Sequence, residues 1–302
     1  MILATATDAG YVELTAVLLA SLALQAGEKA SRVVVFCDGV SAQDKAKLAA
    51  SYGREGLSFL DLTDAELDRF GRLPVSRHLS RTAYARVVMP MMLAQERGRL
   101  LYLDCDTVVN HPLDALETLG LGGHAFGAVE DAATPERRIA RNRRVGLPDA
   151  TPYFNSGVLL IDLDRWRAAG LTERVFAFAA SRPDLPMMDQ DALNGAVAGD
   201  WAPLGETWNM HRPRKASGAD DPLEVWEAAH VVHFVGQEKP NYTDCRHPAR
   251  DLFLRYRARS AFANAPLKSR LSRKIAKRVA ALKRRMARLK AALGLAGQGR
   301  HA

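Results

Sequence analysis

The chain of 302 residues is 48% hydrophobic and 25% charged, with 22 glycines and 14 prolines. This ordinary globular composition excludes disordered, collagen-like and small disulfide-stapled proteins, and the length suits one large α/β domain or two average ones. The net charge of +8 is uneven: residues 264–302 hold 12 of the 42 Lys and Arg residues and no acid, so the other 30 face all 34 Asp and Glu residues. We therefore predict a slightly acidic folded domain over 1–263 and a basic tail over 264–302.

Short apolar runs alternate with helix-like stretches along the first 263 residues, the pattern of a mostly parallel α/β sheet flanked by helices. In chain order the sequence predicts a strand at 2–6, a helix at 11–26, a strand at 32–37, a helix at 41–52, a strand at 57–62, a helix at 80–93, strands at 99–103, 125–130 and 153–161, a helix at 189–198 and a strand at 231–235. Ser41 is the expected N-cap of the second helix, and Pro90 is expected to bend or end the third.

No apolar run approaches the roughly 20 residues that a membrane-spanning helix needs. The apolar segment 14–24 follows Asp8 and Glu13 and no basic residue, so we interpret it as a buried helix rather than the core of a signal peptide. The three cysteines show no C-x-x-C spacing, which favours a reducing cytosol and argues against a structural zinc site.

Asp104 and Asp106 follow the continuously apolar strand predicted at 99–103. Ligands of an α/β sheet bind at the carboxyl ends of its strands, so both carboxylates can reach one cation there. Two carboxylates this close repel each other unless a positive charge lies between them. A divalent metal site is the favoured interpretation, and a solvated pair of strand-end carboxylates is the alternative.

Two further Asp-x-Asp pairs have simpler explanations. Asp162 and Asp164 precede what looks like a helix, with Asp164 as its N-cap. Asp189 and Asp191 stand at the start of another predicted helix, so capping is expected there too. A carboxylate and the Gln190 amide at a helix N-terminus would also suit sugar hydroxyls.

His233 lies in the last predicted strand and is followed by Gly236 and Lys239. A single histidine there is more often a hydrogen-bonded core residue, but Gly permits close approach of the backbone and Lys suits a phosphate. Combined with Asp104 and Asp106, His233 predicts a site for Mn²⁺, or for Mg²⁺, rather than Ca²⁺. Such an ion would neutralise a departing diphosphate, which is the chemistry of a sugar-nucleotide donor.

Other phosphate-binding motifs are excluded by their context. The stretch 120–125 matches the dinucleotide fingerprint but runs from a helix-like segment into a strand, the reverse of what that motif requires, and no Walker A motif is present. The sequence at 104–108 also fits haloacid-dehalogenase phosphatases. It comes too late in the chain for that class, and the later Gly-Asp at Asp200 lacks the second acid.

Six short motifs run in order across most of the chain: ATDAGY at 6–11, RHLSRTAYAR at 77–86, LYLDCD at 101–106, YFNSGVLLID at 153–162, DQDALN at 189–194 and HFVGQEKP at 233–240. In this order they resemble the retaining glycosyltransferases of family 8, which have the GT-A fold. Within that family the bacterial lipopolysaccharide galactosyltransferases and glucosyltransferases are the most similar.

The resemblance implies a UDP-hexose donor and a role for each matching residue. Asp104, Asp106 and His233 would hold Mn²⁺. The donor would contact Ala6, Asp8, Tyr11, Arg86, Asp104, Cys105, Asp106, Asn155, Ser156, Asp189, Gln190, Gly236 and Lys239. Among these, Asp8 and Tyr11 would bind the uridine, the Cys105 backbone the ribose, and Gly236 and Lys239 the diphosphate. His78 and Asp131 would lie beside the acceptor, and Arg86, Asp189, Gln190 and Asp191 are the catalytic candidates.

Retention of anomeric configuration in the family implies either front-face attack or a double displacement. Gln190 is a poor nucleophile because its amide is uncharged, so front-face attack is favoured and Asp191 is the alternative nucleophile. Two positions depart from the family pattern. Asn241 stands where Trp usually follows Lys-Pro, and Ala9 and Gly10 replace more polar residues near the uridine.

Apolar residues recur in the tail at steps of three or four: Leu267, Leu271, Ile275, Val279, Leu282, Met286, Leu289 and Leu293. This spacing is nearer to an α-helix than to a left-handed coiled coil, and the other faces carry basic residues. The tail therefore predicts a basic amphipathic helix on an anionic membrane surface. Packing on the body or on a second subunit is the alternative. Nucleic acid is not an expected partner, because no aromatic residues are interleaved.

The sequence thus predicts a GT-A catalytic domain over 1–263 that transfers galactose or glucose from a UDP-sugar to a saccharide or lipid-linked saccharide. The expected setting is lipopolysaccharide or other cell-surface glycan synthesis, in the cytoplasm and peripheral on the inner face of the cell membrane. The alternative is a catalytically inactive scaffold that binds a UDP-sugar or the membrane.

Overall fold

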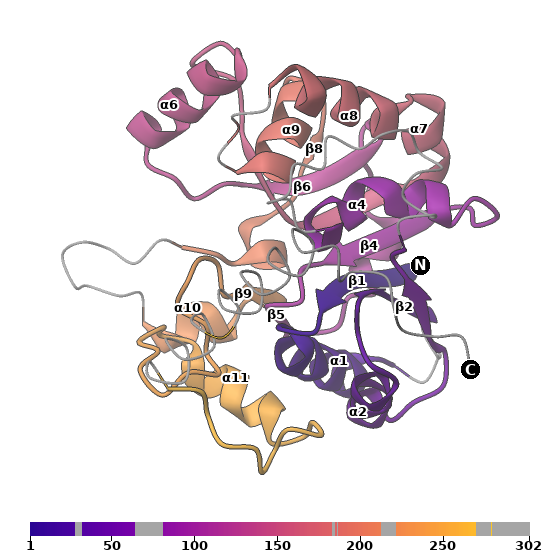
Figure 1. Ribbon diagram of the computed structural model, residues 1–302. Coiled ribbons are helices and arrows are strands. Elements are labelled where there is room, and N and C mark those ends of the chain that lie inside the picture. Colours follow the sequence, from indigo (N-terminus) through magenta and orange to yellow (C-terminus); the bar gives the residue numbers. More distant parts are fainter. Residues whose placement is uncertain are drawn as a thin grey trace, which may run out of the picture.

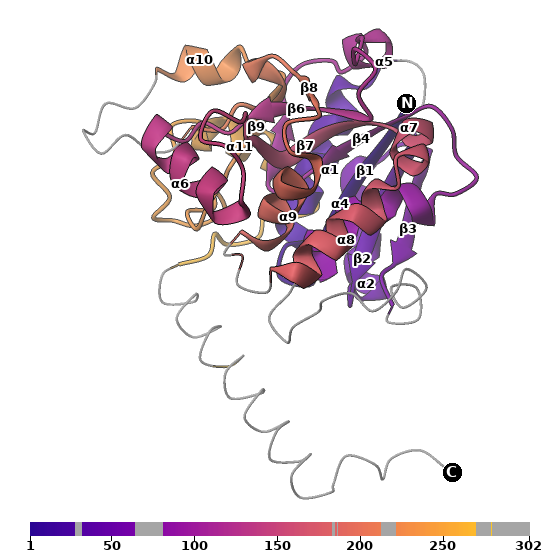
Figure 2. The same cartoon turned by 90° about the horizontal axis from the view of Figure 1, so that it is seen from above.

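The computed structural model describes residues 1–27, 32–63, 81–182, 185, 187–212, 222–269 and 279. Its centre is a seven-stranded sheet in the order β3-β2-β1-β4-β7-β6-β8, with helices on both faces (Figure 1, Figure 2). These strands are β1 Ile2–Asp8, β2 Arg32–Asp38, β3 Leu57–Asp61, β4 Arg99–Leu103, β6 Phe126–Glu130, β7 Phe154–Asp162 and β8 Ala202–Pro203. The first four strands are parallel, whereas β7 runs antiparallel to both β4 and β6. The predicted α/β class with a mixed sheet is confirmed.

Side chains of the central strands alternate between two buried cores. In β2, Val34 and Phe36 face one core while Val33 and Val35 face the other, as expected for a strand covered on both sides. The first core lies against α4 Arg81–Met92, α7 Leu163–Ala168, α8 Leu171–Ser181 and α9 Met188–Val197, and the second against α1 Val12–Gln25, α2 Ala42–Tyr52 and α5 Ala115–Thr118.

A second, two-stranded sheet joins β5 Thr107–Val109 to β9 Val231–His233 in antiparallel register. It packs with α1, α10 Leu223–Glu227 and α11 Arg250–Arg257 around a third core, to which Trp226 and Phe253 belong. Only residues 104–106 separate β4 from β5. The small sheet therefore holds β9 beside the carboxyl end of β4.

The predicted strands and helices are present. Ser41 caps α2 as predicted, accepting a hydrogen bond from the Asp44 N–H at 3.1 Å. Pro90 does not end α4, which continues to Met92. Three longer helices were not predicted: α6 Pro135–Val145, α8 and α11. In α6 the large apolar residues are too few to reveal a helical period, and the main local signal is the proline in its first turn.

The N-caps expected from two Asp-x-Asp pairs are corrected by the structure. The N-cap of α7 is Asp162, which accepts from the Arg165 N–H at 3.0 Å, so Asp164 lies in the first turn instead. Helix α9 begins after Met187, whose own N–H donates to Asp191 Oδ2 at 3.0 Å. Asp189 is therefore not the N-cap of α9 but lies in its first turn.

The chain stays attached to the body at the start of the predicted tail. The Lys268 N–H donates to the Asn241 carbonyl at 2.9 Å, and the Thr243 N–H donates to the Lys268 carbonyl at 2.8 Å. From residue 270 onward the predicted basic helix lies outside the described residues, apart from Val279. Among the described residues, no helix has the length and apolarity to cross a bilayer.

Candidate active site

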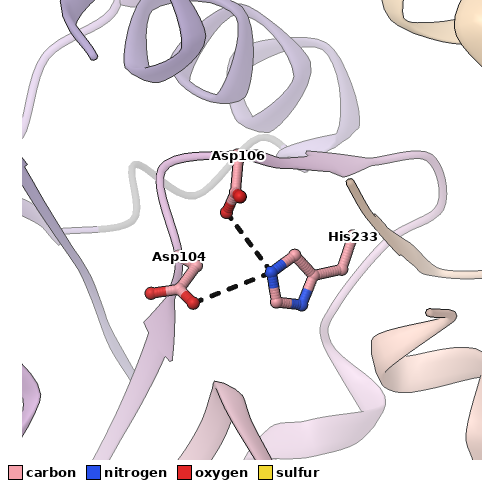
Figure 3. A group of neighbouring side chains, drawn as sticks. All are labelled: Asp104, Asp106 and His233. Atoms are coloured by element: carbon pink, nitrogen blue, oxygen red, sulfur yellow. Dashed lines mark ion pairs between the residues drawn. The ribbon is translucent and has the colours of Figure 1, made fainter. Parts of the chain in front are cut away.

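The ends of β4 and β9 meet at the carboxyl edge of the large sheet (Figure 3). Asp104 and Asp106 follow β4, and Thr107 at the start of β5 pairs with His233 in β9. Asp104, Asp106 and His233 each direct a ligand atom toward one point, and these atoms lie within 4.8 Å of one another. Strand pairing thus brings an imidazole from a distant part of the chain to two carboxylates.

A chain of side-chain amides orients the imidazole of His233. Its Nδ1 lies 3.0 Å from Asn209 Oδ1, and Asn209 Nδ2 donates to Asn155 Oδ1 at 2.9 Å. Because the Asn209 nitrogen is engaged by Asn155, its oxygen faces His233, and Nδ1 carries the proton. Nε2 is then the ring nitrogen that faces Asp106 Oδ1 at 3.3 Å and Asp104 Oδ2 at 3.7 Å. A cation would complete this arrangement.

Gly157 lies directly against the side chains of His233 and Asp104. Its carbonyl accepts from the Asp104 N–H at 2.7 Å. A Cβ atom at this position would lie 2.1 Å from His233 Cε1 and 2.9 Å from Asp104 Oδ2. Only glycine lets Asp104 and His233 converge here, which gives the Asn-Ser-Gly sequence at 155–157 a physical reason.

Arg86 and Tyr102 hold the far side of Asp104. Arg86 Nη2 donates to Asp104 Oδ1 at 2.8 Å, and Nη1 donates to the Ser156 carbonyl at 2.7 Å. Tyr102 Oη donates to Asp104 Oδ1 at 2.5 Å, and Arg86 Nε lies 3.3 Å from Asp189 Oδ2. Burial lowers the pKa of Arg86, but the carboxylates of Asp104 and Asp189 outweigh burial and raise it. The guanidinium is therefore a fixed positive charge in the site.

Lys239 binds the other carboxylate, Asp106. Its ammonium contacts Asp106 Oδ2 and donates to the Phe234 carbonyl at 2.8 Å. Burial by itself would raise the pKa of Asp106, but His233 and Lys239 outweigh it and hold that pKa below its usual range. Burial lowers the pKa of Lys239, yet Asp106 gives a net rise. Both groups are therefore charged at neutral pH.

The residues present fit a divalent metal ion. Two carboxylate oxygens and one imidazole nitrogen form a ligand set that such ions accept. Asp104, Asp106 and Asp189 bring three carboxylates to the region, against the two cations Arg86 and Lys239. A divalent ion offsets the excess negative charge and leaves a positive site for an anionic ligand.

This group opens into a cavity of about 540 Å³, the size of a small-molecule site. The cavity is lined by Arg86, Asp104, Asp106, Asp131, Ala132, Ala133, Arg137, Arg141, Asn155, Ser156, Met187, Asp189, Gln190, His211, His233, Val235 and Gly236. The structure therefore brings most of the predicted donor, metal and acceptor residues around one space.

Two neighbouring residues of α9 lie in different environments. Gln190 lines the cavity, where its Oε1 accepts from the Ser156 N–H at 3.1 Å and its Nε2 donates to Asp131 Oδ2 at 3.3 Å. Asp191 is fully buried and does not line the cavity. Its two oxygens accept from the Tyr153 hydroxyl at 2.6 Å and from a backbone N–H. The structure does not bring Asp191 together with the other catalytic candidates.

Asp131 lines the same cavity as the metal-ligand candidates. Its Oδ1 lies 2.5 Å from Arg141 Nη1 and accepts from the Ala133 N–H at 3.0 Å. The other predicted acceptor residue, His78, lies outside the described residues.

The predicted nucleoside-binding residues lie beside the cavity rather than in its lining. Asp8 ends β1 and accepts from the Gly10 N–H at 2.7 Å, while Tyr11 is 41% exposed. Burial raises the pKa of Tyr11, and the nearby charge of Lys239 opposes that rise. Cys105 lies between the two metal-ligand carboxylates in sequence, and Ala6 is buried within β1.

Sequence reasoning missed four residues of this site: Asn209, His211, Arg137 and Arg141. His211 Nδ1 lies 2.6 Å from the Asn209 carbonyl, and its Nε2 accepts from the Ala132 N–H at 3.2 Å. Burial and the nearby His233 lower the pKa of His211, which favours the neutral ring that this acceptor role needs. No local motif marks these residues except the density of arginines in 137–144.

Comparison with known proteins identifies the family. The model of glycosyl transferase family 8 matches residues 2–241. The chain belongs to glycosyltransferase family 8. General stress protein A of Bacillus subtilis (strain 168) is 30% identical over 241 residues, which span 76% of this chain and 82% of that protein. The lipopolysaccharide 1,3-galactosyltransferase of Salmonella typhimurium is 25% identical over 262 residues, 82% of this chain and 75% of that protein.

Two further matches are a lipopolysaccharide transferase and a solved structure. The lipopolysaccharide 1,2-glucosyltransferase of Escherichia coli (strain K12) is 29% identical over 180 residues, 57% of this chain and 53% of that protein. The crystal structure of the galactosyltransferase LgtC with donor and acceptor sugar analogues matches with a TM-score of 0.70 and 27% identity, covering 86% of this chain and 96% of that one. The predicted GT-A fold is confirmed.

Proposed function

We propose that this family 8 glycosyltransferase moves a hexose from a UDP-sugar to a saccharide acceptor, with retention of anomeric configuration. The observation that carries the proposal is the convergence of Asp104, Asp106 and His233 over Gly157, at the wall of a cavity of about 540 Å³. A side chain at position 157 would clash with His233 and Asp104 and push them apart. Glycine at this position therefore suits a bound ion.

The names of the relatives support galactose or glucose as the transferred sugar. Two of them are lipopolysaccharide glucosyl- and galactosyltransferases, and the LgtC structure holds analogues of both donor and acceptor sugars. On this basis we infer a role in lipopolysaccharide or other cell-surface glycan synthesis, with a saccharide or lipid-linked saccharide as acceptor.

Asp104, Asp106 and His233 would hold Mn²⁺, or Mg²⁺ in its place. When bound, the ion supplies positive charge to the diphosphate as the glycosidic bond breaks. Lys239 lies beside Asp106. Its ammonium would add a second positive charge to the diphosphate when a phosphate oxygen takes the place of Asp106 as its partner. Gly236 has a φ of 85° and no atom within 4 Å of a Cβ built there, so a diphosphate can approach its backbone.

The hexose would lie against Asn155, Asp189 and Gln190, whose amides and carboxylate match sugar hydroxyls. Arg86 fixes this wall by bonding Asp104 and Ser156 at once. Asp131, on the far side of Gln190, would face the acceptor.

Front-face attack is the retaining mechanism that the geometry favours. A double displacement needs a nucleophile in the cavity on the far face of the sugar. Gln190 is in the cavity but uncharged, while Asp191 is buried with both oxygens hydrogen-bonded. The acceptor hydroxyl would therefore attack from the side that the diphosphate leaves.

The basic tail supports a location on the inner face of the cell membrane. Eleven Lys and Arg residues fall between Lys268 and Lys290, and no acid interrupts them. We propose that this segment binds anionic lipid headgroups and holds the catalytic domain near a lipid-linked acceptor.

Calorimetric titration of UDP tests the proposal directly. We expect UDP to bind with Mn²⁺ present and not after EDTA treatment, and GDP to bind far more weakly. UDP-glucose and UDP-galactose are then compared for slow hydrolysis, which identifies the donor sugar. Absence of UDP binding in both conditions would overturn the proposed function. Metal-dependent binding without turnover of either UDP-sugar, with or without saccharide acceptors, would favour an inactive binding scaffold.

A further inference from the structure

Helix α6 lies beside α9 (Figure 1, Figure 2). It carries a high density of arginine, part of which lines the cavity. Its arginines are Arg137, Arg138, Arg141, Arg143 and Arg144. Three are bound by carboxylates: Arg138 by Glu130 at 2.8 Å, Arg141 by Asp131 at 2.5 Å and Arg143 by Asp149 at 2.6 Å. The positive charge of α6 is therefore only partly neutralised.

Arg137 and Arg144 have no carboxylate partner among the residues that the structure describes. Both are exposed, but only Arg137 lines the cavity. Arg137 precedes Arg141 by one helical turn, so the two lie on the same face of α6, the face that meets Asp131.

The two halves of the cavity differ in how their charges are balanced. On the donor side, Arg86 is bound by Asp104 and Asp189, and Lys239 by Asp106. On the proposed acceptor side, Asp131 accepts from Gln190 Nε2 and is already occupied by Arg141 and the Ala133 N–H. The guanidinium of Arg137 is left in excess there.

We propose that the acceptor carries an anionic group, a phosphate or a carboxylate, and that Arg137 binds it as a specificity-determining contact. This inference rests on the proposed function, because it assigns the acceptor to the same cavity. A guanidinium offers paired N–H donors that match the oxygens of a phosphate or carboxylate. A neutral sugar would leave Arg137 without a counter-ion in the acceptor wall.

Three acceptors that differ only at C6 test the inference: methyl galactoside, its 6-phosphate and methyl galacturonoside. Each is offered with Mn²⁺ and the UDP-hexose that the protein hydrolyses. We expect a charged acceptor to have the highest kcat/KM, mainly through a lower KM. The Arg137→Gln variant should lower kcat/KM for that acceptor about tenfold to hundredfold, the effect of one charge-assisted hydrogen bond, and should abolish its advantage over the neutral acceptor. The phosphate and uronate arms distinguish the two sources of charge.

Arg144→Gln is the matched control, because it removes the same charge from the same helix outside the cavity lining. It should keep the preference for the charged acceptor. Equal kcat/KM for charged and neutral acceptors, an unchanged preference in Arg137→Gln, or an equal loss in Arg144→Gln would each overturn the inference. The inference would also be overturned if Arg137→Gln slowed hydrolysis of UDP-glucuronate more than hydrolysis of UDP-glucose. That result would place Arg137 at the donor sugar.

Ligand-detected NMR gives a second readout if none of the three acceptors is a substrate. The same compounds are compared for binding to the protein loaded with UDP and Mn²⁺. Stronger binding of a charged compound that Arg137→Gln weakens supports the inference, and equal binding of all three contradicts it. A failure of UDP itself to bind is instead a failure of the proposed function, which the calorimetric titration detects separately.

Discussion

Three Asp-x-Asp pairs in this chain have the same residue pattern but different surroundings. Asp104 and Asp106 face the imidazole of His233. Asp162 caps α7, and Asp191 joins α9 to Tyr153, the residue before β7. The difference lies in the neighbouring element, because only Asp104 and Asp106 lie next to the end of β9, where His233 is.

Replacing one residue of the first pair tests its role. Asp106→Asn keeps the shape of the side chain but removes a negative ligand. Loss of a residue that only hydrogen-bonds a metal ligand typically lowers metal affinity roughly 10- to 100-fold. Because Asp106 would be a ligand itself, we expect the Mn²⁺-dependent affinity for UDP to fall by more than that. Calorimetry measures the affinity, and far-UV circular dichroism should show unchanged secondary structure.

Asp162→Asn is the matched control for this substitution. Asn is as good an N-cap as Asp, and Asp162 lies away from the cavity lining, so UDP affinity and stability should both be retained. Unaltered UDP affinity in Asp106→Asn would refute the metal assignment.

Between elements, a buried ion pair joins α1 to α11. Arg257 Nε donates to Glu13 Oε1 at 2.8 Å, and both side chains are 7% exposed. Asn241, in place of the Trp expected from the family resemblance, donates to Glu13 Oε2 at 2.7 Å and is 1% exposed. This departure from the family pattern therefore belongs to a buried polar cluster rather than to the cavity.

Removing the cation of this pair should destabilise the fold. In Arg257→Met, Glu13 would stay buried without its main partner, which typically costs about 3–5 kcal/mol. We expect about 3 kcal/mol from urea unfolding, because Lys268 Nζ remains 3.9 Å from Glu13 Oε2. The double variant Glu13→Gln/Arg257→Met should recover much of the loss.

An exposed ion pair serves as the comparison. Arg97 lies 2.7 Å from Asp164, with side chains 74% and 48% exposed. Arg97→Met should change the free energy of unfolding by less than about 1 kcal/mol, since water screens such pairs. If Arg97→Met and Arg257→Met lowered the free energy of unfolding equally, the buried pair would stabilise the fold no more than the exposed one.

Over the whole molecule, charge and fold divide the chain at nearly the same place. The basic residues are concentrated after residue 267. The described part of the chain makes its last backbone contacts with the body at Lys268, which pairs with the segment 241–243. The large sheet, the cavity and the metal-ligand candidates all lie before this point. Donor binding and membrane binding should therefore be separable.

Deleting residues 270–302 tests this separation. We expect the truncated chain to bind UDP and Mn²⁺ as the full chain does. It should lose binding to vesicles of anionic lipid at low salt, where each basic residue contributes about 1 kcal/mol. Co-sedimentation with anionic vesicles measures this, with neutral vesicles and high salt as controls. Retained vesicle binding would place the membrane contact in the body, and lost UDP binding would indicate that the tail packs on the catalytic domain.

Local patterns in the sequence predicted most of the strands and helices and part of the site. Short apolar runs between helix-like stretches predicted β1, β2 and β4, and Ser41 predicted the start of α2. Both signals can be read locally because hydrophobic pattern and capping depend on neighbours in the chain. Asp104 and Asp106 were visible for the same reason, as they follow β4 directly. Helix α6 was missed because few apolar residues mark its period.

The tertiary structure alone decided which side chains face one another. The sequence already named His233 as a metal ligand, but only the pairing of β5 with β9 shows how it reaches Asp106, and Asn209 then sets the orientation of its ring. Packing of α9 on β7 turns Gln190 into the cavity and Asp191 away from it. These contacts join residues far apart in the chain, and a local pattern contains no information about them, because it records neither strand register nor the partner of a buried charge.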